Sequence, residues 1–410
     1  MSIKITTIWW WNGQSIILSA FNKYLPQEFE ISSIVSMSDD WRTTWRLIRD
    51  FDNSFWIHLP PPWDLRRCFY TSSKSKYIYF FKHLLENIFV SNKNISDLTI
   101  KDLLYLSISD VLKNIQNENI KETDLKFLKN IKNEIKLYLN NNSWELYNFF
   151  YEKLWEYINI RLNISKPIKW YKFWNILMAS IYHNLWDYNK MLEIMHNFLE
   201  VKYKIIPVTI KKAFIKANLE NWDIIETQDN ISNNINYSSK ISSIELMRCS
   251  RNAIHHEDVD STIINADYII ITPWDLFTSI IANFIIGWVK NSIQKSNAKI
   301  ILIWNNTNKW WEAFNLKIID FIENIERYLW KRIDFFITNN KKITLDQSEL
   351  DRFKNDISVK WWDFLYLEKE EIKKLKNRWT KIITWDLLDK KVFYKHNKKE
   401  IAKIIYGLIK

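Results

Sequence analysis

The clearest chemistry in the sequence lies near the start of the chain. Residues 4–8 form a short apolar, β-branched run that is typical of a buried parallel strand. Residues 9–13 follow as a turn, and a helical pattern then runs over 14–24. A strand-to-helix turn of this kind can hold nucleotide phosphates through backbone N–H groups and a helix N-terminus, and a tight structural turn is the alternative. Such a turn needs small residues, because an indole fills the space that a phosphate requires.

The composition explains why this turn is unusual. The chain has 410 residues, with 23 Trp and only 3 Gly, whereas glycine is ordinarily about 7% of a protein, or about 29 residues here. The two counts together come to 26, and globular chains need glycine wherever φ is positive. We therefore hypothesise codon reassignment: UGA means Trp in some genetic codes and Gly in others, and the abundance of Ile, Asn and Lys indicates A+T-rich coding. Most positions written Trp would then be glycine in the native protein.

Three further segments place Trp where a phosphate-binding protein needs glycine. Residues 38–47 read S-D-D-W-R-T-T-W-R-L, residues 59–68 read L-P-P-P-W-D-L-R-R-C, and residues 273–280 read P-W-D-L-F-T-S-I. The last segment directly follows an apolar run over 267–272, so it predicts a second strand-to-helix turn.

The elements that must position these segments alternate between strands and helices. Residues 38–67 are expected to form a polar loop region that contains prolines, and about 77–161 an inserted helical subdomain. This alternation predicts a doubly wound α/β architecture. The expected strands are 4–8, 31–37, 205–209, 213–220, 224–228, 267–272, 300–303 and 381–384, and the expected helices are 14–24, 172–183, 187–199 and 398–409.

With glycine in place of Trp, the four segments resemble the CofD/YvcK family in the same order. That family shows G-G-G-T-G, A-D-D-G-G-S-S-G-R-L, P-P-G-D-L-R-N-C and G-P-G-S-L-Y-T-S-I. Further similarity at 173–175, 184–187, 204–209 and 396–408 extends the match over nearly the whole chain outside 77–161. The resemblance implies a Rossmann-like, mostly parallel sheet in one domain over 1–410, with a nucleotide or nucleotide sugar bound at the C-terminal ends of its strands.

Two functional branches follow from the resemblance. The segments at 38–47 and 59–68 are more similar to the YvcK branch, which binds UDP-sugars and acts in carbon metabolism and cell-wall morphogenesis without an established catalytic turnover. The alternative is the CofD branch, a 2-phospho-L-lactate transferase type of enzyme that moves a phospholactyl or phosphoenolpyruvyl group from a nucleotide-activated donor to a deazaflavin precursor. Whether the chain is an enzyme stays open. Because the family's compact members lack the insertion at about 77–161, it also stays open whether the protein forms a homo-oligomer.

The resemblance and the residue chemistry together assign a candidate ligand site, with no catalytic residue among its members. Asp39 and Asp40 suit a hydrated Mg²⁺ ion or ligand hydroxyls, although a solvated or helix-capping pair is the alternative. The arginines suit phosphate, with surface ion pairs as their alternative. The candidate ligand- and phosphate-binding residues are Trp9, Trp10, Trp11, Asn12, Gly13, Arg42, Arg46, Pro62, Trp63, Asp64, Arg66, Asn184, Pro273, Trp274, Asp275 and Thr278.

One departure from the family pattern concerns the second turn. Thr272 and Asp275 stand where the family has Gly and Ser. An additional carboxylate beside an anion needs a cation or a hydroxyl to compensate its charge.

Other signals favour structural readings. Residues 255–258, H-H-E-D, look like a metal cluster, but adjacent ligands seldom converge on one ion, so a polar surface turn is expected. Neither a Ser/His/Asp order nor a Walker-type Gly-Lys-Ser signature stands out, which disfavours hydrolases and P-loop ATPases.

Charge and cysteine content set the remaining expectations. The net charge of +11 and the many aromatic residues would also suit a binder of single-stranded nucleic acid. The Trp positions cluster at turns rather than along one groove, so no nucleic-acid partner is expected.

Two cysteines without a metal or disulfide pattern favour a reducing cytoplasm. The apolar segment 266–289 is broken by Asp267, Pro273 and Asp275, so we expect a strand, a turn and a helix there rather than a membrane span.

Overall fold

The structure of the chain is a computed structural model that describes most of its residues. The predicted site residues Trp10, Asp39, Asp40, Pro62 and Trp274 lie outside the described residues. The described residues are 2–9, 11–26, 28–37, 42–56, 58–61, 63–116, 152–233, 239–273, 275–309, 312, 316–340, 362–364, 367, 369–376, 378, 380–389 and 395–410.

The chain divides into two compact units, which are described separately. The first contains Met1–Asp40 and Tyr203–Lys410, and the second contains Trp41–Lys202. The predicted insertion at 77–161 lies inside the second unit. Its two flanking helical stretches, at 42–72 and 173–198, belong to that unit as well.

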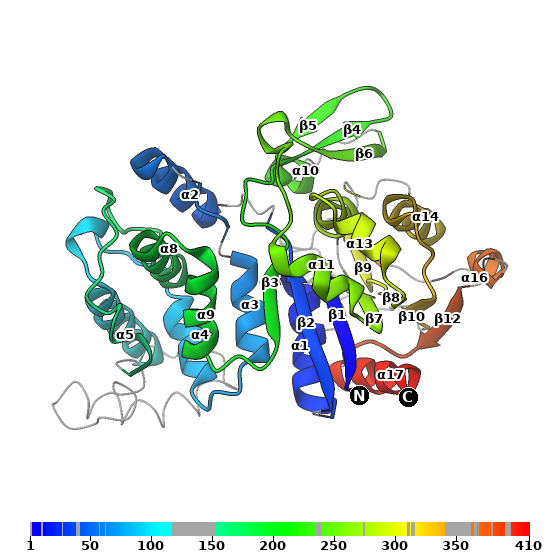
Figure 1. Ribbon diagram of the computed structural model, residues 1–410, viewed down its shortest axis with the longest axis horizontal. Coiled ribbons are helices and arrows are strands. Elements are labelled where there is room, and N and C mark those ends of the chain that lie inside the picture. The colour runs from blue at the N-terminus through cyan, green and yellow to red at the C-terminus, as the bar shows by residue number, and fades with distance from the viewer. Residues whose placement is uncertain are drawn as a thin grey trace. The chain divides into compact units, whose positions relative to one another are not determined.

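A seven-stranded sheet forms the centre of the first unit (Figure 1). Every pairing in it is parallel, and all its strands except the edge strand Lys381–Trp385 carry buried apolar side chains, as expected when helices cover both faces. The predicted doubly wound, mostly parallel α/β fold is therefore confirmed. In spatial order the strands are β12 (Lys381–Trp385), β10 (Phe335–Asn339), β8 (Lys299–Ile303), β7 (Tyr268–Ile271), β1 (Ile3–Trp9), β2 (Phe29–Val35) and β3 (Lys204–Pro207).

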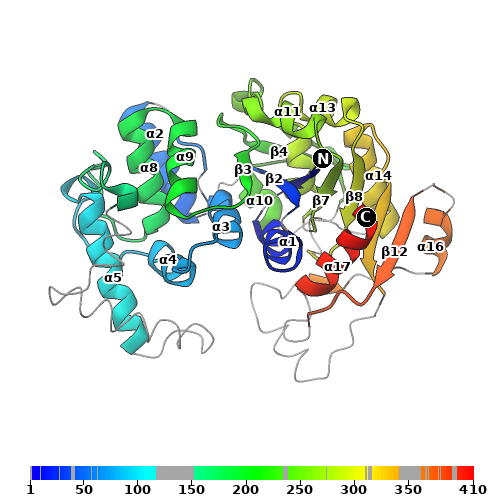
Figure 2. The same cartoon turned by 60° about the horizontal axis from the view of Figure 1, so that its bottom comes forward.

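Helices cover both faces of this sheet. Figure 2 shows α1 (Trp11–Tyr24) and α17 (Lys398–Ile409) on one face, with α11 (Glu257–Ile264), α13 (Val289–Lys295) and α14 (Ile318–Leu329) on the other. The predicted helix at 398–409 is confirmed at both ends. It begins after Asn397, whose side chain accepts hydrogen bonds from the N–H groups of Lys399 and Glu400 and so satisfies two donors that the helix leaves free.

Smaller elements complete the first unit. An antiparallel three-stranded sheet is formed by β5 (Ile224–Glu226), β4 (Ile215–Leu219) and β6 (Ile241–Leu246). The remaining elements are α10 (Gln228–Asn233), η2 (Arg248–Ser250), η3 (Leu276–Ile281), α12 (Ala282–Phe284), α16 (Lys369–Lys376) and the antiparallel pair β9 (Thr307–Lys309) and β11 (Trp362–Phe364).

The second unit is helical in its described part. The prediction of a loop over 38–67 was wrong, because α2 occupies Arg42–Phe55 and α3 begins at Trp63. In α2 the buried residues Thr44, Leu47, Ile48 and Phe51 recur every three or four positions, which is the spacing of one helix face. The helices of this unit are α2, α3 (Trp63–Ser72), α4 (Ile78–Leu85), η1 (Ile95–Asp97), α5 (Ile100–Gln116), α8 (Phe173–Leu185) and α9 (Tyr188–Phe198).

The apolar segment 266–289 folds as predicted, into β7, a turn and helices. Within the described residues, no single helix has the length and apolar composition needed to cross a membrane. Only the bent pair Leu276–Phe284 and Val289–Lys295 meets that requirement, when its two helices are taken together.

The backbone has a left-handed conformation at several Trp positions. Among the described residues, seven non-glycine residues have positive φ, and five of them are Trp. Glycine is the residue that adopts this conformation without steric cost, so these positions agree with the glycine hypothesis. The five are Trp56 (φ 58°), Trp170 (75°), Trp186 (53°), Trp222 (72°) and Trp330 (52°).

Two of these five tryptophans end helices, whereas Trp174 lies inside a helix. Trp186 and Trp330 directly follow the last residues of α8 and α14, where helices commonly end in glycine. Trp174, by contrast, is fully buried in α8 and packs against the ring of Phe69 at 5.8 Å. The structure therefore does not require glycine at position 174.

A buried histidine beside β8 predicts acid sensitivity. The Nε2 atom of His396 bonds the carbonyl oxygen of Trp304 at 2.8 Å, and burial lowers the pKa of His396 to about 4. Its pKa in the unfolded chain is about 6.5. Below that pH, the histidine is therefore protonated in the unfolded state but stays neutral in the native state. The neutral histidine therefore contributes fully to the free energy of unfolding above about pH 6.5. As the pH falls toward 4, about 3 kcal/mol of this free energy is lost.

Urea unfolding at neutral pH and near pH 4.5 would measure this loss. His396→Gln keeps an N–H donor for the Trp304 carbonyl but does not titrate, so the variant should lose less stability over the same interval. Equal pH dependence of both proteins would show that His396 is not the responsible group.

Candidate functional site

The two predicted turns lie at one edge of the large sheet. Strand order reverses at β1: the chain runs outward from β1 to β2 and β3 on one side, then from β7 to β8, β10 and β12 on the other. In register, Ile8 lies opposite Ile271, so the turns that follow β1 and β7 leave the sheet side by side. Doubly wound sheets bind their ligands at such a reversal, outside the carboxyl ends of the strands.

The first turn is shorter than predicted. β1 continues to Trp9 and α1 begins at Trp11, so Asn12 and Gly13, which were expected in the turn, lie in the first turn of the helix. Tryptophan permits a regular helical start here more readily than glycine does. The N-terminus of α1 still follows the carboxyl end of β1, which is the position that phosphate-binding turns occupy.

The side chain of Gln14 links the first turn of α1 to the sheet by hydrogen bonds, a role that could not be predicted from the sequence. Its side chain is fully buried, and its Nε2 atom donates to Thr7 Oγ1 at 3.1 Å and to the hydroxyl of Ser33. These partners belong to β1 and β2, so one amide holds the first turn of α1 against two strands. Its spacing after the turn was visible in the sequence, but its strand partners were not.

The second turn is organised by a carboxylate that sequence reasoning also missed. Pro273 and Asp275 are buried between β7 and η3, and Thr278 is buried in the first turn of η3. The Glu312 carboxylate accepts hydrogen bonds from the N–H groups of Phe277 and Thr278, at 2.9 and 2.7 Å. Glu312 lies 34 residues beyond Thr278 along the chain.

Buried polar atoms gather at the same edge of the sheet. The Oγ1 of Thr272 follows β7, the Oδ1 of Asn306 follows β8, and the Oε1 of Gln14 follows β1. All three side chains are almost completely buried, and among the described residues these atoms have no hydrogen-bond partner. Buried polar atoms are rarely left without a partner in folded proteins, so these three atoms are exceptions among the described residues.

The remaining predicted site residues belong to the second unit. Arg42 begins α2, and Trp63 and Asp64 begin α3. Arg46 on α2 and Asn184 near the end of α8 are exposed. They are available to solvent, as a ligand contact requires, and their assignment as ligand residues stays a prediction.

Arg66 has a different environment from the other arginines. Its side chain is completely buried, and its Nε lies 2.5 Å from Oε1 of Glu86. Lys172 approaches the other oxygen of Glu86 at 2.8 Å. Burial opposes the charge on Glu86, but Arg66 and Lys172 outweigh it and lower the pKa of this carboxyl. Burial and the neighbouring guanidinium lower the pKa of Lys172 to about 8. Arg66 is thus part of a buried ion-pair network.

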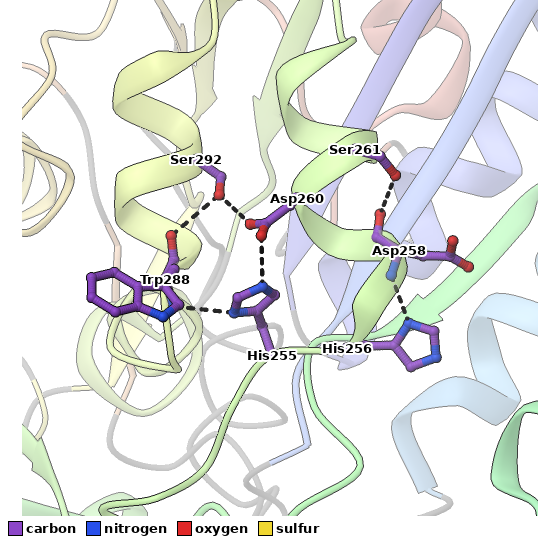
Figure 3. Close-up of polar contacts among 7 residues, drawn as sticks. All are labelled: His255, His256, Asp258, Asp260, Ser261, Trp288 and Ser292. Carbon is purple, nitrogen blue, oxygen red and sulfur yellow. Dashed lines mark hydrogen bonds and ion pairs between the residues drawn. The ribbon is translucent and has the colours of Figure 1, made fainter.

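Both histidines of the segment 255–258 make hydrogen bonds to neighbouring protein groups. Figure 3 shows His255 between the backbone N–H of Trp288, at 3.1 Å from Nδ1, and Asp260, at 2.9 Å from Nε2. Because Nδ1 accepts a hydrogen bond, Nε2 carries the proton and donates it to the carboxylate. His256 caps α11 by accepting from the N–H of Asp258. No group of three or more His, Cys, Asp or Glu residues suited to a metal occurs among the described residues.

Ser292 joins this cluster without forming a catalytic triad. Its hydroxyl donates to Asp260, so the carboxylate lies between the serine and the histidine (Figure 3). A nucleophilic serine would have to contact the histidine instead. The cluster therefore links the loop before α11 to α13. Gly287 has a φ of 46°, and a Cβ added there would lie 2.7 Å from Nδ1 of His255, so glycine is required beside the imidazole.

The fold defines a doubly wound α/β protein in which two strand-to-helix turns lie side by side at the reversal of strand order. The chain belongs to the CofD family: the family model described as 2-phospho-L-lactate transferase CofD matches residues 12–380.

Individual relatives carry the name gluconeogenesis factor. The chain is 25% identical over 252 residues to a provisionally named gluconeogenesis factor of Clostridium acetobutylicum, with 57% of this chain and 54% of that protein covered. It is 28% identical over 198 residues to a protein of the same provisional name from Thermotoga maritima, with 48% and 59% covered. The gluconeogenesis factor of Bacillus subtilis is 22% identical over 252 residues, with 61% and 75% covered. The match thus spans less than two thirds of the first two relatives.

The fold also matches a solved structure. A UPF0052 family protein from Bacillus halodurans superposes with a TM-score of 0.69 at 16% identity, over 99% of this chain and 100% of that chain. This likeness shows a shared fold.

Proposed function

We propose that the protein binds a nucleotide sugar, a UDP-sugar first of all, and acts in the regulation of carbon metabolism and cell-wall morphogenesis in the cytoplasm, as the YvcK branch does. The observation that carries the proposal is the reversal of strand order between β1 and β7, which brings two strand-to-helix turns together where doubly wound sheets bind ligands. Similarity to gluconeogenesis factors adds support.

Within this proposal the parts of the ligand meet different groups. The phosphates lie at the N-terminus of α1, where N–H groups and the helix dipole favour an anion. Asp39 and Asp40 follow β2 in the sequence and would hold a Mg²⁺ ion through one or two carboxylates and water. The buried atoms of Thr272 and Asn306 suit the hydroxyl-bearing parts of the ligand.

Calorimetric titration with UDP-glucose tests the proposal. We expect a Kd in the micromolar range, about −8 kcal/mol, for protein with glycine at positions 9, 10 and 11. Little or no heat is expected with tryptophan there, because an indole is too large for a turn that must leave space for a phosphate. Glucose alone serves as the control for the sugar. The absence of binding by the glycine form to every uridine nucleotide, even at high concentration, would refute the proposal.

A second candidate is the phospholactyl transferase activity. The description of the matched family model supports it. A gain of phospholactyl mass on the deazaflavin precursor, measured by mass spectrometry after incubation with a nucleotide-activated donor, would establish this activity.

A further inference from the structure

The start of the helix that follows β7 is already occupied by a side chain. Glu312 is 2% exposed, and its Oε1 accepts from the N–H groups of Phe277 and Thr278. The hydroxyl of Thr278 lies 3.0 Å from each oxygen of the same carboxylate. η3 and α12 together form one helix over Leu276–Phe284, so the carboxylate covers its N-terminal end.

This arrangement replaces the usual local cap. Asp275 is the residue before the helix, where an Asp side chain commonly accepts the free N–H groups. Here Asp275 makes no capping hydrogen bond, because Glu312 takes the N–H groups that Asp275 would otherwise reach. Both carboxylates are buried at the same turn.

We propose that Glu312 is an internal anion that closes this turn to phosphate, so that the turn after β7 meets an uncharged, hydrogen-bonding part of the ligand. The inference rests on the proposed function. It assigns the phosphates of the ligand to the turn after β1 alone. Hydrogen bonds to a charged carboxylate are among the stronger ones in proteins, and the N–H groups that an oxyanion would use are already bonded. A phosphate would also meet the carboxylate of Glu312, which is a like charge.

The neutral character of the remaining contacts supports this assignment. The Oγ1 of Thr272, which directly precedes the turn, is buried and lacks a partner among the described residues. A hydroxyl can donate or accept, and it therefore matches a hydroxyl or carbonyl of a ligand without needing a charge. Glu312 thus determines which part of the ligand this turn can accept.

Selenate soaking tests the proposal directly, because selenate imitates phosphate and gives an anomalous signal. Crystals of the unaltered protein, of Glu312→Ala and of Glu245→Ala are soaked and compared. Glu245 is an exposed carboxylate on β6, paired with Lys216 at 3.3 Å, and its removal controls for the change in net charge. We expect selenate at the N–H groups of Phe277 and Thr278 in Glu312→Ala alone.

Two results would overturn the proposal. Selenate at this turn in the unaltered protein, with Glu312 displaced, would make the turn a phosphate site. A folded Glu312→Ala protein without selenate there would show that the N–H groups do not form an anion site. If Glu312→Ala does not fold, Glu312→Gln replaces it: the amide still fills the turn, so selenate bound there would contradict the proposal. The UDP-glucose titration is independent of these crystals, so failure of the proposed function is recognised separately.

Discussion

Glycine at the five left-handed tryptophan positions is expected to stabilise the protein by about 3–5 kcal/mol in total. A residue with a Cβ loses about 1–2 kcal/mol in this conformation, and glycine recovers most of it despite its larger loss of backbone entropy. Two of the five indoles contribute little burial in return, since Trp56 and Trp222 are 91% and 92% exposed, whereas the other three are about half exposed. The free energy of urea unfolding measures the effect in a variant with glycine at positions 56, 170, 186, 222 and 330.

Alanine at the same five positions provides the matched control. It removes the indole but keeps the Cβ, so the backbone strain remains and we expect little gain. Equal stabilisation by alanine and glycine would assign the effect to the exposed indoles instead. Peptide mass spectrometry of the native protein over these positions then decides whether the cell itself inserts glycine, as the codon hypothesis holds.

Arg66→Met is expected to lower the free energy of unfolding by about 3–5 kcal/mol, because it removes one partner of a buried ion pair. Glu86 would keep only Lys172, which is 2.8 Å away, and would lose the guanidinium that most lowers its pKa. Methionine has a similar length, so the change removes charge with little change in volume. Urea unfolding of the variant measures the loss.

Lys190→Met is the control for this substitution in the same unit. Lys190 and Glu193 form an exposed pair at 2.8 Å, and pairs of this kind contribute at most about 1 kcal/mol. The sequence predicts that Arg66 contacts the ligand instead. Unchanged stability together with weaker nucleotide binding in Arg66→Met would support that original assignment and contradict a structural role.

The fold could be predicted from the sequence where local patterns were strong. Short apolar runs identified β1, β7 and β8, because strands buried on both faces carry little else. β10 was missed although it is also a short apolar run, F-F-I-T-N. α2 was missed because its charged and polar residues outweighed the helical spacing of Leu47, Ile48 and Phe51.

The candidate site was predictable only as far as it is local. The turns after β1 and β7 could be recognised because each lies within a few consecutive residues. Glu312 could not, since its role depends on a contact with Thr278, 34 residues away. The buried position of Arg66 likewise depends on Glu86 and Lys172, which only the folded helical unit brings to it.

The central position of β1 has a consequence for how the chain is made. The N–H of Lys4 bonds the Asp267 carboxylate across 263 residues, and β7 is the neighbour that closes one side of β1. At about 5–20 residues per second on the ribosome, β7 is synthesised on the order of 10 to 50 s after β1. Throughout that time β1 presents on this side an open edge of the kind that pairs with other chains.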